Sequence, residues 1–348
     1  RDRRSRHEEA DTKKQTRRSR REEADKKKQQ KTTTRRSNMK KQQEETRRRN
    51  IKIRKAEEAG FDMVWNSGES IPTFAAMLNN TDAIKVGSGV IRAFQHHPKN
   101  IAQHVLDLQL MYGDRFVLGL GGGTKYMNIA TLGEDFSKPA SRIREIINFL
   151  RYAWSVGVED KINFDGQFYQ ITGAPLRWNE EPNQLRAPIY LAAVNPAMLR
   201  MAGDICDGLC GHPIASVDFI NNVVWPHVDE GLERSGRTRE SFDHQTWVTM
   251  AVSHDRNQAI KELKVHLARF MATRSYSIVL DSQGYQDVKE AIQDAFFNNP
   301  EDVDALANAL PDEVALKHGI AGTPDDILEQ IQPVSYTHLR AHETLRYR

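Results

Sequence analysis

Two side chains that can exchange protons follow short apolar runs in this chain of 348 residues. Glu69 comes shortly after FDMVW (61–65), and His212 comes directly after GLCG (208–211). A partly desolvated carboxylate or an imidazole can act as a general acid or base. If both runs are strands of one parallel sheet, both side chains lie at its carboxyl edge, where such sheets bind ligands. The structural alternatives are an acid at the start of a surface helix and a loop histidine with satisfied hydrogen bonds.

A glycine-rich loop offers a second kind of site. The run FVLGLGGGTKYMN (116–128) is typical of a strand followed by backbone without side chains, which a flat ligand can approach closely. A plain tight turn is the alternative. The loop does not match a dinucleotide fingerprint, because Thr124 stands where its third glycine would fall. It does not match a phosphate-binding P-loop either, because no glycine directly precedes Lys125.

Other polar side chains near these runs have two possible roles each. Arg92 and Lys125 could hold an anionic part of a cofactor, or they could simply be solvated. His96 and His97 precede a predicted helix, so we expect them to position or cap it. Four tryptophans are expected to be packing residues rather than lids over a cofactor. They are Trp65, Trp154, Trp225 and Trp247.

Several common chemistries find no support in the sequence. The only cysteines, Cys206 and Cys210, lack the further ligands of a zinc site, so we expect them to be reduced and buried. Residues 51–333 contain no H-x-x-x-H or H-E-x-x-H pair, so we expect no metal. The absence of a G-x-S-x-G motif disfavours a hydrolase.

Residues 51–333 must position these side chains, and they alternate between strand-like and helix-like patterns. Alternating βα units predict a parallel sheet, and seven of them fit a (β/α)8 TIM barrel that lacks one strand. We expect the missing strand to be the first, and an open doubly wound sheet is the alternative. The predicted strands lie near residues 63, 84, 116, 189, 208, 246 (run 245–253) and 316 (run 314–322). The predicted helices include 51–59 ending at Gly60, one starting at Pro98, 141–154 and one starting after Thr323. A hairpin with an Asp165-Gly166 turn is expected at 162–171.

Both ends of the chain differ from this middle part. Residues 1–50 hold 21 basic and 9 acidic side chains, a balance of +12 against −9 in the remainder. With three apolar side chains, this low-complexity basic segment cannot bury a core, so we expect it to be disordered or foreign to the natural protein. A nucleic-acid-binding arm is the alternative, but no aromatic residue is interleaved for base stacking. The run VSYTHLRAHET (334–344) resembles a translated sequencing adapter, so we expect 334–348 to be an artefact.

The sequence also predicts where the protein works and with what. No apolar run is long enough to span a membrane, and no leader precedes a cleavage site. We therefore expect a soluble cytoplasmic protein that binds a small-molecule substrate. We expect it to bind neither nucleic acid nor membrane, and to form a homodimer.

Six segments in order resemble a known family. They are EEAGFDMVW, IKVGSGV with the following HHP, DRFVLGLGGGT, INFDGQFYQI, PIYLAAVNPAMLRMAGDICDGL and IAGTPDDILEQI. Over Ile51 to Ile331 the chain is similar to the luciferase-like monooxygenase superfamily, and in particular to its coenzyme F420-dependent oxidoreductase branch.

The resemblance implies a barrel of the bacterial luciferase type with the F420 deazaflavin across its carboxyl mouth. It implies a non-proline cis peptide bond between Gly89 and Val90, behind the cofactor ring. The implied cofactor contacts are Gly89, Val90, Gly122, Gly123, Thr124, Asn128, Ala192, Ala193, Val194 and Asn195.

The implied function is an oxidoreductase that moves a hydride between F420 and a small organic substrate, with Glu69 or His212 passing a proton. The first alternative is a monooxygenase that uses reduced flavin mononucleotide (FMN) and O2. The second is a non-catalytic cofactor-binding barrel. Thr124 favours this second alternative, because it stands where the sugar-phosphate dehydrogenases of the branch carry a catalytic glutamate. Those enzymes also carry a histidine in place of Glu69, so we do not expect their chemistry here.

Overall fold

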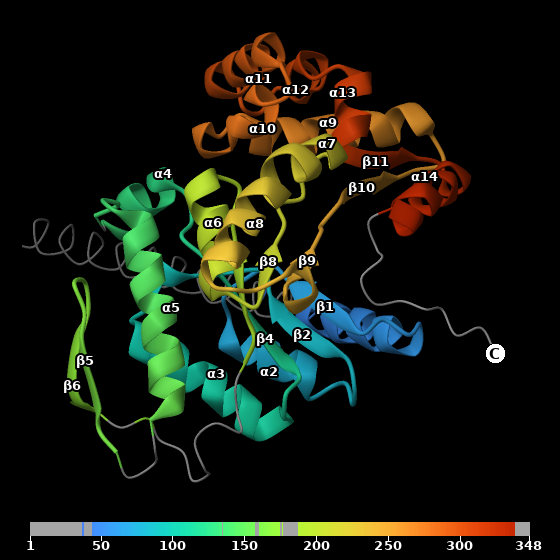
Figure 1. The fold of residues 1–348 in the computed structure, drawn as a ribbon. Coiled ribbons are helices and arrows are strands. Elements are labelled where there is room, and N and C mark those ends of the chain that lie inside the picture. Colours follow the sequence, from blue (N-terminus) through green and yellow to red (C-terminus); the bar gives the residue numbers. More distant parts are fainter. Residues whose placement is uncertain are drawn as a thin grey trace, which may run out of the picture.

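A curled parallel sheet forms the centre of the fold (Figure 1). The computed structural model describes residues 37, 44–133, 135–156, 160–174, 176 and 187–337. The seven-stranded sheet has the order β1-β2-β4-β7-β8-β9, with β3 also beside β4, and every pair in it is parallel. Its strands are β1 (Met63–Asn66), β2 (Lys85–Ser88), β3 (Ile91–Arg92), β4 (Phe116–Gly121), β7 (Ile189–Ala192), β8 (Gly208–Cys210) and β9 (Asp243–Gln245).

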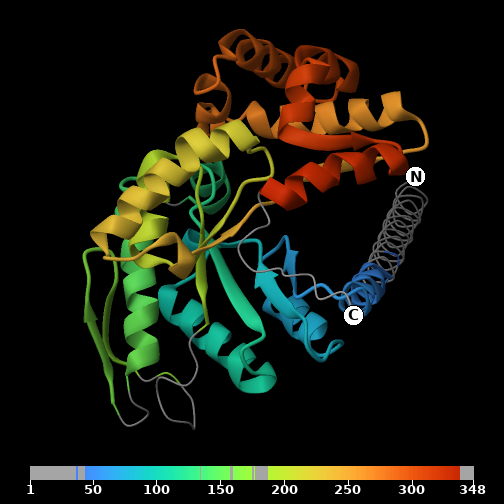
Figure 2. The same cartoon turned by 45° about the vertical axis from the view of Figure 1, so that its right-hand side comes forward.

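Helices cover the outer face of this sheet, and a separate layer lies beyond its carboxyl ends (Figures 1 and 2). The helices after the successive strands are α2 (Ile71–Leu78), α3 (Pro98–Tyr112), α4 (Lys125–Met127), α5 (Pro139–Ser155), α6 (Pro196–Ile205), α7 (Val217–Phe219) and α8 (Trp225–Arg234). The C-terminal layer contains the strands β10 (Thr249–Val252) and β11 (Gly319–Gly322). Its helices are α9 (Arg256–Met271), α10 (Ile278–Asp281), α11 (Gln286–Asn298), α12 (Val303–Ala309), α13 (Asp312–His318) and α14 (Pro324–Thr337).

Local signals in the sequence set the helix ends as predicted. Helix α3 begins at Pro98, and His97 caps it because its Nδ1 accepts a hydrogen bond from the Lys99 backbone N–H at 3.2 Å. The helix before β1 covers residues 44–58 and is followed by Gly60 at a φ of +82°. Before α14, the Thr323 hydroxyl accepts from the Asp326 N–H, and the Asp326 carboxylate accepts from the Thr323 N–H.

The fold has an outer and an inner apolar cluster. The outer one lies between sheet and helices and includes the predicted face of α5. The inner one lies on the concave side of the sheet, where Tyr190 and Ala192 alternate with the outward Ile189 and Leu191 of β7. Its buried residues are Val117, Tyr190 and Cys210, packed against Met63, Trp65, Val90, Ala192 and Trp247.

The tryptophans pack as expected. The rings of Trp65 and Trp247 lie 5.6 Å apart inside the curl. Trp154 is buried and donates to the Ala102 carbonyl at 3.1 Å, while Trp225 stacks on the Arg239 guanidinium at 4.3 Å. Both cysteines are free and buried, and burial raises the pKa of the Cys206 thiol to about 12.

Two predicted strands were wrong in extent. The run 245–253 contains β10 and only the last residue of β9, because β9 ends at Gln245 beside β8 while β10 leaves the main sheet and pairs with β11. The run 314–322 starts as helix α13. The buried side chains Val314, Ala315 and His318 have helical spacing, and acids open this helix while Lys317 and His318 close it.

The hairpin of β5 (Ile162–Asp165) and β6 (Gln170–Ala174) was predicted correctly, but its turn was not. Asp165 pairs with Gln170, so residues 166–169 form the loop rather than an Asp165-Gly166 turn. The Glu145 carboxylate of α5 accepts three backbone N–H bonds, at 2.7 to 2.8 Å, from this loop. A tertiary contact therefore stabilises the wider loop.

The sheet is open among the described residues, where β1 pairs only with β2 and β9 only with β8. The predicted parallel sheet is thus confirmed as a curled half-barrel, and its completion to a (β/α)8 barrel stays a prediction. The first helix begins by residue 44, inside the segment predicted to be a tail, and the predictions for 1–36, 38–43 and 338–348 lie outside the described residues. No helix in the described ranges is both long and apolar enough to cross a membrane. The same ranges contain no cluster of His, Cys, Asp and Glu suited to a metal ion.

Candidate functional site at the carboxyl edge of the sheet

The cis peptide bond and the glycine loop lie side by side at the carboxyl edge of the sheet. The bond between Gly89 and Val90 is cis, as the resemblance implied. It connects β2 to β3, and β3 pairs with the end of β4 through Ile91–Leu120 and Arg92–Gly121. A Cβ added at Gly121 would lie 2.8 Å from Val90 Cγ2, so only glycine fits there.

Two predicted cofactor contacts shape the glycine loop with their own side chains. Asn128 is 3% exposed, and its amide donates to the carbonyls of Gly122 at 2.8 Å and Thr124 at 2.9 Å. The Thr124 hydroxyl accepts from the Met127 N–H and so caps α4. The partly exposed backbone of Gly122 and Gly123 therefore remains available to a ligand.

The segment after β7 borders the same edge with small side chains. Ala192 lies beside Gly121, and Ala193 and Val194 are buried. Asn195 points elsewhere, because its side-chain amide donates to the Ser275 carbonyl at 3.0 Å. Asn195 thus connects this segment to the C-terminal layer.

Glu69 belongs to a polar cluster at the end of β1. Its side chain is 14% exposed, forms an ion pair with Arg92 Nε, and lies 3.3 Å from His96 Nε2. The Gln95 amide, with its nitrogen towards Glu69, donates to the same carboxylate at 2.8 Å. Arg92 is therefore engaged by Glu69 rather than free for an anionic ligand, whereas Lys125 is exposed.

His212 has a contrasting environment after β8. Its ring packs against those of Phe270 at 5.4 Å and Tyr276 at 4.3 Å. Burial lowers the pKa of His212 to about 4, so the imidazole is neutral at pH 7. Its Nδ1 is buried without a hydrogen-bond partner, next to a cavity of about 10 Å³, which holds roughly one water molecule.

A second unpaired polar atom lies near the cis bond. Trp247 Nε1 is buried without a partner, and a Cβ added at Gly89 would lie 2.7 Å from the Trp247 ring. Buried polar groups normally have partners, so the two unpaired nitrogens suggest a place where a bound molecule supplies them. No contact joins Glu69 to His212 in the described part of the chain.

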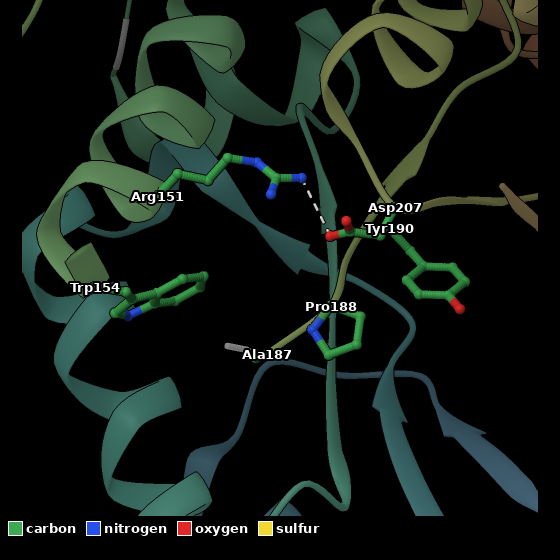
Figure 3. Close-up of a pocket in the computed structure, with 6 residues that line it drawn as sticks. All are labelled: Arg151, Trp154, Ala187, Pro188, Tyr190 and Asp207. Atoms are coloured by element: carbon green, nitrogen blue, oxygen red, sulfur yellow. Dashed lines mark hydrogen bonds and ion pairs between the residues drawn. The ribbon is translucent and has the colours of Figure 1, made fainter. Parts of the chain in front are cut away.

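A larger hollow of about 330 Å³ lies at the opposite, amino edge of the sheet (Figure 3). It is bordered by Arg151 and Trp154 of α5, by Ala187 and Pro188, and by Tyr190 and Asp207. Asp207 accepts from Arg151 Nη2 at 3.1 Å and from the Ile189 N–H at 2.8 Å, while Arg151 Nε is a further buried nitrogen without a hydrogen-bond partner. The Arg151–Asp207 pair holds α5 against the start of β7 and β8. We place the candidate ligand site at the carboxyl edge because parallel sheets of this kind bind ligands there.

Sequence reasoning missed the residues that surround the candidate acids. Gln95 joins the Glu69 cluster, and Phe270 and Tyr276 enclose His212. No local pattern marks them, because they lie 26, 58 and 64 positions from the side chains that they contact.

A parallel sheet curled around an apolar cluster, with polar groups at its carboxyl edge, defines an α/β protein of the half-barrel type with a candidate ligand site at that edge. The luciferase-like monooxygenase family matches residues 15–341, and the chain belongs to this family. The chain is 30% identical over 291 residues to 5,10-methylenetetrahydromethanopterin reductase of Archaeoglobus fulgidus, covering 80% of this chain and 83% of the reductase. It is 31% identical over 270 residues to F420-dependent glucose-6-phosphate dehydrogenase of Nocardia farcinica, covering 76% of this chain and 73% of the dehydrogenase.

Solved structures share the fold. The coenzyme F420-dependent tetrahydromethanopterin reductase of Methanopyrus kandleri superposes with a TM-score of 0.69 at 24% identity, covering 82% of this chain and 85% of that one. The oxygenating constituent of 3,6-diketocamphane monooxygenase from Pseudomonas putida, in complex with FMN, gives a TM-score of 0.56 at 16% identity. The superposition covers 84% of this chain and 83% of that one. At these identities the likeness concerns the fold alone.

Proposed function

We propose that this protein is an oxidoreductase that transfers a hydride between coenzyme F420 and a small organic substrate. One observation carries the proposal. At one edge of the sheet, glycine-rich backbone lies together with the unpaired nitrogens of His212 and Trp247. Relatives named as F420-dependent, at about 30% identity, support the choice of cofactor. Identity at that level does not carry their substrates over to this chain.

The residues at the edge fit a flat heteroaromatic cofactor. The backbone of Gly122 and Gly123 and the side chains of Val90 and Ala192 are at least partly exposed, and their small size would let a ring approach closely. When bound, F420 supplies the carbon that accepts or gives the hydride. The chain's own part is to orient the two reactants and to exclude water.

His212 is our first candidate for handling the substrate's proton. As a neutral imidazole it can accept a proton from a substrate hydroxyl, or donate a hydrogen bond to a carbonyl oxygen. Glu69 is the second candidate, acting together with Arg92 and His96. The unpaired nitrogen of His212 favours it over Glu69, whose oxygens already have partners.

We also propose that the curled sheet is most of a (β/α)8 barrel. In that arrangement one more strand would pair with the free edge of β1 and face β11. Exposed apolar side chains on β10, Met250 at 45% and Val252 at 51%, support it, because a closed barrel would cover such groups.

A flavin-dependent monooxygenase is the second candidate function. The observation that favours it is the shared fold with the FMN complex of the camphane monooxygenase. A flat isoalloxazine ring would meet the same backbone and the same small side chains. The two candidates therefore differ in cofactor rather than in the location of the site.

Titration of the purified protein with each cofactor separates the two functions. We expect F420 to bind more tightly than FMN, measured by quenching of cofactor fluorescence and by calorimetry. Asn128→Leu removes two hydrogen bonds from the glycine loop and should weaken F420 binding about tenfold, at roughly 1 kcal/mol per bond with partial compensation. The matched control is Asn298→Leu on the exposed face of α11, which should bind like the wild type. Tighter FMN binding without a response to F420 would overturn the proposal.

A further inference from the structure

We propose that Ser216, Gln283 and His318 form a positioning network that holds the loop of His212 in place. The inference rests on the proposed function only in that His212 serves the site. The network lies behind the loop, on the side of the C-terminal layer, and none of its members is among the candidate ligand contacts.

His318, the last residue of α13, is the buried centre of the network at 2% exposure. Its Nδ1 lies 2.6 Å from the Ile214 carbonyl oxygen, which can only accept, so Nδ1 carries the hydrogen. Its Nε2 is then the acceptor, and it lies 3.4 Å from the Gln283 amide nitrogen. Burial lowers the pKa of His318, in agreement with this neutral form.

Gln283 completes the network without leaving an amide atom unpaired. Its nitrogen also donates to the Val279 carbonyl at 2.5 Å, and its oxygen accepts from the Ser216 hydroxyl at 2.8 Å. The Ser216 oxygen in turn accepts from the Phe219 N–H at 3.1 Å and caps α7. A chain of satisfied hydrogen bonds therefore joins α13, the segment after α10, and the loop after β8.

The two anchored residues lie within and directly after the turn that starts at His212. Ile214 and Ser216 follow His212 by two and four positions, and the Ala215 N–H donates to the His212 carbonyl at 3.0 Å. The neighbours of the His212 ring, Phe270 and Tyr276, belong to the same C-terminal layer. This layer thus fixes both the backbone and the ring of His212 relative to the main sheet.

Reactivity of His212 towards diethylpyrocarbonate, mapped by peptide mass spectrometry on the full chain without cofactor, tests the inference. His318→Leu removes the anchor to the Ile214 carbonyl, and Gln283→Leu removes the anchor to the Ser216 hydroxyl. Loss of about 1.4 kcal/mol per loop anchor should raise local opening of the loop, and with it the modification rate, about tenfold. His318→Asn keeps a donor for the Ile214 carbonyl and should stay close to the wild-type rate. In turnover assays the leucine variants should lower kcat while F420 affinity stays unchanged.

Gln109→Leu is the matched control, because Gln109 is another buried glutamine, with its amide donating to the Phe116 carbonyl on the far side of the fold. It should lower overall stability without raising His212 reactivity. Equal His212 reactivity in Gln283→Leu and Gln109→Leu would overturn the inference. Should the leucine substitutions impair folding, the His212 reactivity of Ser216→Ala can be compared with that of Gln109→Leu instead. Failure of F420 to bind would refute the proposed function but leave this result intact.

Discussion

Glu69 and His212 occupy equivalent places after two strands, yet their surroundings differ. Glu69 is engaged by Arg92, His96 and Gln95, whereas His212 is enclosed by aromatic rings and keeps an unpaired nitrogen. A group whose polar atoms are already satisfied must give up a partner before it can serve a substrate. We therefore expect the two residues to respond differently to substitution.

His212→Asn should lower kcat by about 10²- to 10⁴-fold, the range for loss of a general acid or base. Glu69→Gln should cost less, about tenfold, because it loosens the cluster around Arg92 rather than removing the proton carrier. Steady-state kinetics with F420 measure both effects. His254→Asn at an exposed position is the matched control and should leave kcat unchanged. Full turnover by His212→Asn would contradict the assignment.

Among the elements, strand β1 has a free edge. The Lys85 N–H donates to the Asp62 carbonyl and the Gly89 N–H to the Asn66 carbonyl, so alternation turns the Met63 and Trp65 amides away from β2. Unpaired edge amides exchange faster with solvent, and an unpaired edge can accept another strand.

We expect hydrogen exchange to be faster at the Met63 and Trp65 amides than at Val64 and Asn66, the alternate positions of β1. Fusing one further strand ahead of the helix over 44–58 should protect both edge amides and raise the Tm, as the barrel proposal requires. A fusion with prolines at alternate positions cannot donate to the edge and is the matched control. Equal Tm values for the two fusions would contradict a closed barrel.

The stability of the whole molecule should depend on buried neutral imidazoles. The pKa of His212 is about 4 when folded against 6.5 for an ordinary histidine, so below pH 6.5 the unfolded chain binds a proton that the folded chain does not. Stability should therefore be complete above pH 6.5 and fall as the pH drops towards 4. At 1.36 kcal/mol per pKa unit, the lowered pKa of His212 accounts for a loss of up to about 3 kcal/mol in the free energy of unfolding. The lowered pKa of His318 acts in the same direction.

Urea unfolding at pH 7.5 and pH 4.5 measures this loss. His212→Asn should reduce the difference in unfolding free energy between the two pH values, because asparagine does not titrate. The exposed His254→Asn should leave the difference as it is. If the unfolding free energies at the two pH values differ as much in His212→Asn as in the wild type, the imidazole must be protonated, or accessible to water, in the folded state.

The sequence by itself determined the local structure and the family. Helix ends such as Pro98 and Thr323 depend on contacts within one turn, so residue types next to each other predict them. The order of βα segments predicted a parallel sheet, and the quoted motifs identified the family and the cis bond at Gly89–Val90. These features are encoded over short distances along the chain.

Only the tertiary structure decided which candidate side chains are engaged and which are free. Arg92 neutralises Glu69 over 23 positions, Asn128 folds back on its own loop, and Tyr276 encloses His212 over 64 positions. The separate pairing of β9 and β10, the loop held by Glu145 and the network behind His212 arise in the same way. Each depends on a partner distant in sequence, whose position is set by packing of the whole sheet and its helices rather than by local pattern.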